Sequence, residues 1–309
     1  MIEGQEDVSW DDWRAIADAC ERHGVETLFR SDHYLSVQGA FGRGSLDAWT
    51  TLASLAAVTT TLRLGTLVSP ATFRHPAVLA KSAATVDHVS GGRVELGMGA
   101  GWLEAEHTAF GFPFPAPSER MEVLEEQLEV VRRLWADGAS SFAGRHYRLE
   151  DVDARPKPVQ RPGPPLIVGG HAGPRSARLA ARFADEYNTY SATAADCRER
   201  RQRVAEACER EGRDPLPLSL MTGFLVGSDR AELLERARRL GRWRGDDGQP
   251  EDTLAALPES WVAGTIPEAL AKLRELEDAG VERVMLQHLL HEDLDAVALI
   301  GRELAPAVA

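Results

Sequence analysis

The sequence predicts an α/β protein in which one domain, residues 1–309, forms a (β/α)₈ TIM barrel. Strand-like and helix-like segments alternate along nearly the whole chain, and a short segment at the N-terminus brings the total to about eight pairs. The length and the 43% hydrophobic content allow one large core. The unusual side chains follow predicted strands, which is where such a barrel carries its active face. A doubly wound open sheet is the alternative.

The first predicted helix begins at a capping box formed by Ser9 and Asp12 and ends at Gly24. The sequence VETLFRS that follows has the composition of a strand. Ahead of the helix only Met1–Glu3 is available for a strand, although a barrel strand usually needs about five residues. We therefore expect either a stunted first strand or a natural start that lies upstream.

Two further helices and two strands complete the N-terminal part of the predicted barrel. Ser45 is expected to cap a helix, and LRLGTLV, residues 62–68, has the pattern of the next strand. Pro76 opens a third helix that ends at Gly91, because proline fits the first helical turn and glycine fits the left-handed stop. Residues 94–98 then alternate as a short buried strand.

The C-terminal half repeats the alternation with two insertions. Residues 119–136 have the pattern of an amphipathic helix, and SSFAGRHYRLEDV, inside an insertion at about 137–160, that of a hairpin. The polar, proline-bearing segment 242–259 is interpreted as a loop insertion. A capping box of Thr265 and Glu268 opens a late helix. The remaining strands are expected at residues 166–168, 184–191, 216–226 and 281–287.

Charge and cysteine content limit the classes of protein. The 35 lysines and arginines against 48 acids give a formal charge of −13, which opposes binding to nucleic acid or anionic lipid. No run of eighteen apolar residues and no secretory signal is present. The widely spaced cysteines argue against a disulfide framework or a zinc knuckle. We expect a cytoplasmic protein that acts on a small molecule.

The strand at residues 94–98 runs into the segment Gly97–Gly101, where side chains are missing or minimal. A flat, large ligand fits against such bare backbone before Trp102 restores bulk. A simple tight turn is the alternative. A dinucleotide-binding fingerprint fits less well, because it requires glycine at the place of Trp102.

A metal-dependent barrel hydrolase would draw its ligands from Asp32, His33, His75, His88 and Glu95. No H-x-H or H-E-x-x-H spacing is present among them. We therefore predict no metal site and interpret His75 and His88 as structural.

Five motifs follow one another along nearly the whole chain: SDH at 31–33, TLVSPATFRHP at 66–76, DHVSGGRVELGMGAGW at 87–102, PKPVQRPGPPLIVGG at 156–170 and GTIPEAL at 264–270. In this order and spacing they resemble the luciferase-like monooxygenase family of flavin and deazaflavin barrels, particularly its F420-dependent branch. The resemblance implies an oxidoreductase with a flavin-like cofactor at the barrel mouth, and a homodimer.

The resemblance also implies how the cofactor is held. The strand that ends TLVSP should contain a non-proline cis peptide bond at a bulge that supports the ring; by position we expect it at Thr66–Leu67, with an ordinary bulge as the alternative. The phosphate should lie at the loop 169–173, where N–H groups at a helix start suit an anion, unless this is a plain turn. Arg175 then faces either the phosphate or solvent. The expected cofactor-binding residues are Asp32, Thr66, Leu67, Val68, Gly99, Ala100, Gly101, Gly169, Gly170, His171, Ala172 and Gly173.

Asp32 and His33 correspond to the family's aspartate beside the cofactor ring and histidine in the substrate cavity, and they are the expected catalytic residues. We assign His33 as the proton donor or acceptor, because imidazole changes charge near neutral pH. A structural, hydrogen-bonded histidine is the alternative.

Trp102 stands where several deazaflavin enzymes of this fold carry a glutamate, so their acid–base mechanism does not carry over. Trp102 and His288 are expected to line the substrate pocket. Glu104 or Glu106 is expected to be a capping or packing residue.

The leading hypothesis is an F420-dependent oxidoreductase that moves a hydride between the deazaflavin ring and an unidentified small organic substrate. The rival is an FMN-dependent monooxygenase that receives reduced flavin from a partner reductase. A cofactor-binding protein without turnover is the third hypothesis, because Trp102 replaces the familiar acid. None of the three requires nucleic acid or a membrane.

Overall fold

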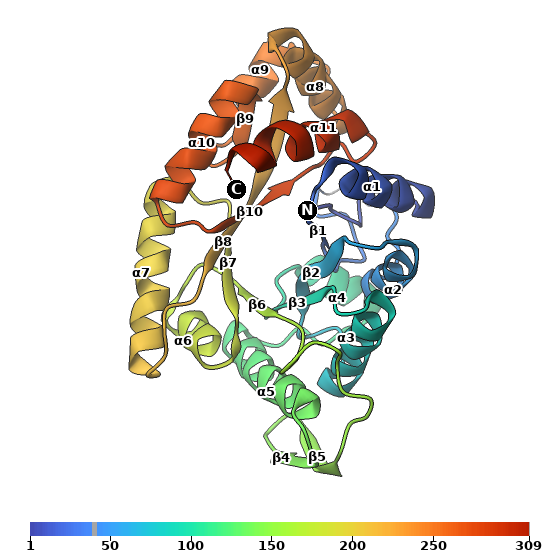
Figure 1. Cartoon of the computed structure of the whole chain (residues 1–309), viewed down its shortest axis with the longest axis vertical. Helices are drawn as coiled ribbons and strands as arrows, with labels where there is room; N and C mark the ends of the chain where they lie inside the picture. The colour runs from blue at the N-terminus through green and yellow to red at the C-terminus, as the bar shows by residue number, and fades with distance from the viewer. Residues whose placement is uncertain (39–41, 309) are drawn as a thin grey trace.

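The computed structural model describes residues 1–38 and 42–308, and a curved parallel sheet surrounded by helices lies at its centre (Figure 1). The hydrogen-bonded order is β1-β2-β3-β6-β7-β8-β10, and β9 pairs with β8. The strands follow one another around the sheet in chain order, as in a (β/α)₈ barrel, whereas a doubly wound sheet reverses direction part-way. The strands are β1 (Thr27–Arg30), β2 (Arg63–Pro70), β3 (Val94–Gly99), β6 (Leu166–Gly169), β7 (Glu186–Tyr190), β8 (Leu218–Gly227), β9 (Val262–Thr265) and β10 (Arg283–Gln287).

The first two residues join the two edge strands of this sheet. Ile2 makes an isolated parallel bridge with Arg30, and its N–H donates to the Phe29 carbonyl at 3.0 Å. On the other side the Met1 amino group donates to the Leu286 carbonyl at 2.9 Å. The expected stunted first strand is therefore present as this short bridge between β1 and β10.

Helices cover the outside of the sheet, and several of their ends follow the predicted signals, although Asp47 and not the expected Ser45 caps the helix that begins at Ala48. Ser9 and Thr265 form capping boxes with Asp12 and Glu268, and Gly24 ends the first helix at a φ of 77°. None of the described helices is long and apolar enough to cross a membrane. The helices on the outside are α1 (Trp10–His23), α2 (Ala48–Val58), α3 (Pro76–Ser90), α5 (Pro117–Trp135), α6 (Pro174–Phe183), α7 (Ala194–Arg210), α8 (Arg230–Trp243), α10 (Ile266–Asp278) and α11 (Leu294–Leu299).

The amino ends of the strands meet in a network of ion pairs. Glu95, which is 3% exposed, accepts from Arg63 at 2.7 Å and from Arg283 at 2.8 Å. Arg283 also lies 3.2 Å from Glu186. Each of these residues is the first or second of its strand, so the network lies at the end of the barrel opposite the predicted site.

The excursions from the barrel differ in part from the prediction. The hairpin is present as β4 (Ser140–Ala143) and β5 (Arg148–Val152). The segment 242–259, expected to be a loop, contains the helix α9 (Pro250–Ala255). The long strand β8 pairs with β9 next to this segment, α8 packs on these two strands, and α9 packs on α8 (Figure 1).

Candidate active site at the mouth of the barrel

The predicted site residues lie at one end of the barrel. Asp32 and His33 follow β1, the segment Gly99–Gly101 closes and follows β3, and the loop 169–173 closes and follows β6. These three strands run parallel, so their carboxyl ends face the same way. The predicted site residues of these three strands therefore lie at the same end of the barrel, as the functional hypothesis requires.

The non-proline cis peptide bond joins Leu67 and Val68, one residue later than the expected Thr66–Leu67. Thr66 still pairs in register with Leu96, and the shift in the β2–β3 ladder lies between Thr66 and Ser69. The predicted bulge is therefore present, and the cis bond lies one residue further along within it.

The glycines of the mouth make room for the Val68 side chain. A Cβ built on Gly99 would lie 2.6 Å from Val68 Cγ2, and one on Gly169 would lie 3.1 Å from Val68 Cγ1; a Cβ on Gly97 would meet the Thr66 carbonyl oxygen first and lie 3.0 Å from Val68 Cγ1. Side chains at these positions would force Val68 to move. Val68 thus fills part of the space that the sequence analysis assigned to a ligand.

Asp32 is buried at 1% exposure and is held through one of its two oxygens. Its Oδ2 accepts from Ser69 Oγ at 2.7 Å and from Arg74 Nη1 at 2.5 Å, and Ser69 Oγ accepts from Trp49 Nε1 at 3.0 Å. Its Oδ1 is buried and has no hydrogen-bond partner in the described part of the chain. A buried acceptor without a donor is rare in folded proteins, so Oδ1 is available to a ligand.

Arg74 connects Asp32 to the outside of the barrel. Its Nη2 donates to Asp47 Oδ2 at 2.7 Å and to the Tyr34 hydroxyl at 3.0 Å. Burial opposes the charge of Asp47, but the Thr50 N–H and Arg74 outweigh burial and lower the pKa of Asp47 to about 2. Asp47 is therefore ionised at neutral pH.

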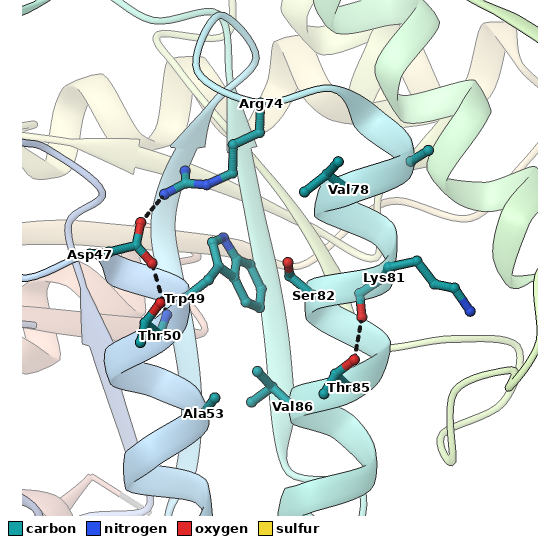
Figure 2. A pocket seen from close by; sticks show the side chains of 11 residues that line it. Asp47, Trp49, Thr50, Ala53, Arg74, Val78, Lys81, Ser82, Thr85 and Val86 are labelled. Atoms are coloured by element: carbon teal, nitrogen blue, oxygen red, sulfur yellow. Dashed lines mark hydrogen bonds and ion pairs between the residues drawn. The ribbon is translucent and has the colours of Figure 1, made fainter. Parts of the chain in front are cut away.

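Arg74 and Asp47 also close one end of a cavity of about 730 Å³ between α2 and α3 (Figure 2). Trp49 projects between the two helices and lines the same cavity. The cavity lies between helices on the outside of the barrel, so it is not the expected substrate pocket. Arg74, which lines this cavity, also donates a hydrogen bond to Asp32.

His33 is paired with a glutamate that the sequence analysis had interpreted as a capping or packing residue. Its Nδ1 lies 2.6 Å from Oε1 of Glu106, and the other oxygen of Glu106 accepts from the Tyr34 N–H at 3.0 Å. The Glu106 side chain is fully buried and that of His33 is 12% exposed. Burial opposes the charged imidazolium, but the hydrogen bond and the charge of Glu106 prevail and raise the pKa of His33. No other hydrogen bond of the His33 ring is found among the described residues.

Trp102 borders His33 on one side. The two rings meet edge to face with centroids 5.6 Å apart and an interplanar angle of 80°. Trp102 is 62% exposed, which is unusual for a large aromatic side chain. The short helix α4 (Glu104–Phe110) begins two residues later and carries Glu106 into the site.

The loop 169–173 leads into α6. Its contacts are with β7, whereas Arg175 contacts a different element. The Gly170 N–H donates to the Asn188 carbonyl at 2.9 Å, and the His171 ring packs against Tyr190 at 4.3 Å. Arg175 donates instead to the Ser118 carbonyl at 3.0 Å, on the neighbouring α5. Arg175 is therefore turned toward α5.

The other histidines of interest are held by backbone contacts. His288 is buried, its Nε2 lies 3.0 Å from the Asp293 carbonyl, and burial lowers its pKa to about 4, so the ring is neutral at pH 7. Its place in a substrate pocket stays a prediction. His75 caps α3 through its side chain, and His88 contacts the Lys157 carbonyl at 2.8 Å, as expected of structural histidines.

Sequence reasoning missed two charged partners of the site, Glu106 and Arg74. A signal existed for each. Glu106 stands in the segment WLEAEH directly after the glycines, and Arg74 stands in TLVSPATFRHP between a strand and a helix. Both lie in the loops that a barrel uses for function.

The profile of the family described as luciferase-like monooxygenase matches residues 2–304. Over 184 residues the chain is 34% identical to an FMNH2-dependent dimethylsulfone monooxygenase of Pseudomonas putida, covering 59% of this chain and 49% of that relative. Over 313 residues it is 28% identical to an F420-dependent glucose-6-phosphate dehydrogenase of Segniliparus rotundus, covering 93% and 91%.

The fold has a close counterpart among solved structures. An F420-dependent secondary alcohol dehydrogenase in complex with an F420–acetone adduct has a TM-score of 0.82 at 20% identity, covering 100% of this chain and 98% of that one. At this identity the likeness concerns the fold alone. The chain spans about half of the length of the dimethylsulfone monooxygenase and 66% of uncharacterised mycobacterial relatives.

Proposed function

Because the chain belongs to the luciferase-like monooxygenase family, we propose that it is an F420-dependent oxidoreductase that transfers a hydride between the deazaflavin ring and a small organic substrate. The observation that carries the proposal is that two groups lie at the same end of the barrel: the buried acceptor Asp32 Oδ1, which has no donor among the described residues, and the His33–Glu106 ion pair. One group suits a bound ring and the other suits proton transfer beside it.

Two further features of the described residues fit a phosphorylated ring cofactor. The first turn of α6 receives no side-chain cap from Gly173 and contains no acidic residue, so its N–H groups suit a phosphate. Arg200 brings a cation to the same place. It donates to the Tyr190 carbonyl at 3.2 Å, and its charge adds to burial in lowering the pKa of His171.

When bound, the deazaflavin supplies a two-electron centre that accepts or donates a hydride. The role of the protein in this proposal is to move the accompanying proton, through the ring of His33. Glu106 orients the ring through Nδ1 and stabilises the imidazolium, which leaves Nε2 to give or take the proton. Asp32 is in this proposal the fixed charge that holds the ring, because Arg74 and Ser69 orient it.

The choice of F420 over FMN is supported by how far each kind of relative aligns. The F420-dependent relative aligns with 93% of this chain and the FMNH2-dependent one with 59%. An FMN-dependent monooxygenase with a partner reductase is the second candidate, because that shorter match is the more identical one. Titration of the apo protein with F420 and with FMN separates the two, and micromolar binding of FMN without binding of F420 would overturn our choice.

Turnover is tested with reduced and oxidised F420 and a panel of alcohols, aldehydes, ketones and sugar phosphates. We expect a change in F420 absorbance with at least one substrate class, and its loss in His33→Asn. Tight binding of F420 without turnover, over a broad panel, would favour a cofactor-binding protein without turnover.

The family relationship also leads us to propose a homodimer in the cytoplasm, with a partner reductase only if FMN is the cofactor. Sedimentation equilibrium measures the first point directly. A mass of one chain, 33.7 kDa, at micromolar concentration would contradict it.

A further inference from the structure

Tyr187, the second residue of β7, has a fully buried side chain whose hydroxyl lies against the loop 169–173. A buried phenol normally has a hydrogen-bond partner, and Tyr187 has two. Both belong to the loop or to the first turn of the helix that follows it. Neither the sequence motifs nor the roles described above account for this residue.

The hydrogen bonds of Tyr187 form a directed chain. The Ala172 N–H donates to Tyr187 Oη at 2.6 Å, and Tyr187 Oη lies 3.1 Å from Ser176 Oγ. Ser176 Oγ donates to the Gly173 carbonyl at 3.1 Å. Since the Ser176 proton is used there, the hydrogen between the two hydroxyls comes from Tyr187. The chain thus runs from the Ala172 N–H through two hydroxyls to the Gly173 carbonyl, and successive bonds of this kind strengthen one another.

The loop needs such an anchor because of its backbone. Ala172 is fully buried and has a φ of 52°, in the left-handed region that residues with a side chain rarely adopt. At Gly170, a Cβ would lie 2.8 Å from Tyr187 Oη. The hydroxyl therefore occupies the room of a side chain at position 170 and holds position 172 in a conformation that it would otherwise leave.

We propose that Tyr187 is a positioning residue that sets the loop 169–173 and the first turn of α6 to receive the phosphate of the cofactor. This inference rests on the proposed function, because the loop is a phosphate site only if the barrel holds a phosphorylated ring. Tyr187 itself touches neither the phosphate nor the reacting atoms. Burial raises its pKa, so the hydroxyl stays protonated and the direction of the chain is the same throughout the neutral range.

The test uses Tyr187→Phe, which removes the hydroxyl and keeps the ring. The whole chain is titrated by fluorescence with two pairs: FMN against riboflavin, which lacks the phosphate, and F420 against its deazaflavin core with the ribityl chain, which lacks the phosphate and the tail attached to it. We expect the phosphorylated member of the bound pair to bind about ten-fold more weakly, and the phosphate-free member to stay within about two-fold.

Tyr190→Phe is the matched control. Tyr190 ends the same strand and is 41% exposed, and its packing on His171 survives the loss of the hydroxyl. We expect this variant to bind both members of each pair as the unchanged protein does.

Equal weakening of both members of a pair, or of neither, in Tyr187→Phe would overturn the inference and leave the cofactor assignment standing. Failure of the unchanged protein to bind either FMN or F420 would overturn both. If Tyr187→Phe does not fold, Ser176→Ala breaks the next link at a half-buried position. We then expect about three-fold weaker binding, again only of the phosphorylated ligand, and a loss without that selectivity counts against the inference.

Discussion

Replacing Glu106 by glutamine tests the proton-transfer role of His33. Glutamine keeps the shape of the side chain but removes the charge that lies 2.6 Å from His33 Nδ1. The Glu106 side chain is fully buried and His33 is 12% exposed, so water cannot replace the lost carboxylate. Burial then becomes the dominant influence on the ring, and it favours the neutral form. The pKa of His33 should therefore fall.

The size of this change follows from the kind of contact that is lost. A hydrogen bond to a charged group contributes about 1.5–3 kcal/mol, and 1.36 kcal/mol corresponds to ten-fold in proton affinity. The proton affinity of His33 should fall by roughly 10- to 100-fold in Glu106→Gln. NMR titration of the histidine ring protons measures it, with His33→Asn to assign the signal. Glu104→Gln, which removes an exposed carboxylate from the first turn of the same helix, should leave the titration unchanged.

The same pair predicts how stability depends on pH. The folded pKa of His33 is raised above the unfolded value of 6.5, so its contribution is fully present below pH 6.5 and is lost as the pH rises through the folded pKa. The advantage of the unchanged protein over Glu106→Gln in urea unfolding should therefore be full below about pH 6.5 and should shrink as the pH rises through the raised pKa of His33. An unaltered His33 titration in Glu106→Gln would refute this account of the site.

Three further outcomes follow from contacts elsewhere in the barrel. Arg200→Gln should weaken binding of FMN or F420 by about 3- to 10-fold and leave riboflavin unaffected, because only the phosphate pairs with the guanidinium; equal loss for riboflavin would contradict this. Glu95→Gln should lower the free energy of unfolding at pH 7 by about 2–4 kcal/mol in urea, less than for a fully buried pair because Arg63 and Arg283 are about one-third exposed. The lowered pKa of Glu95 makes that loss shrink as the pH falls through the folded pKa. Gly99→Ala should lower the free energy of unfolding by about 1–3 kcal/mol, and adding Val68→Ala should recover part of that loss. Strictly additive losses would argue against a contact between position 99 and Val68.

The fold was predictable where its signals are local. The capping box of Ser9, the stop at Gly24 and the hairpin after α5 depend on a few neighbouring residues, and each formed as expected. The start of α2 was predicted at Ser45, but Asp47 supplies the cap. Ser45 Oγ instead donates to the His33 carbonyl at 2.7 Å, a contact between residues 12 positions apart that no local helix signal encodes.

The site was predictable in its positions and not in its partners. The motif order located Asp32, His33 and the loops that follow β3 and β6. Glu106 is 73 residues from His33 along the chain, and Arg74 is 42 residues from Asp32. No local sequence pattern encodes such pairs, because the two residues of each pair meet only in the folded barrel. The short α4 was missed for a similar reason: it has seven residues and no side-chain cap, so it depends on packing rather than on local signals.

The contacts at the mouth also indicate different roles for the two predicted catalytic residues, Asp32 and His33. Asp32 is paired with Arg74, whose guanidinium is only 13% exposed and also pairs with Asp47. Asp32 is thus fixed in its orientation by Arg74 and Ser69. His33 is paired with a single carboxylate through one ring nitrogen, so it can lose its proton and keep a hydrogen bond to Glu106. In the proposed function, His33 therefore moves the proton that accompanies hydride transfer, and Asp32 holds the ring.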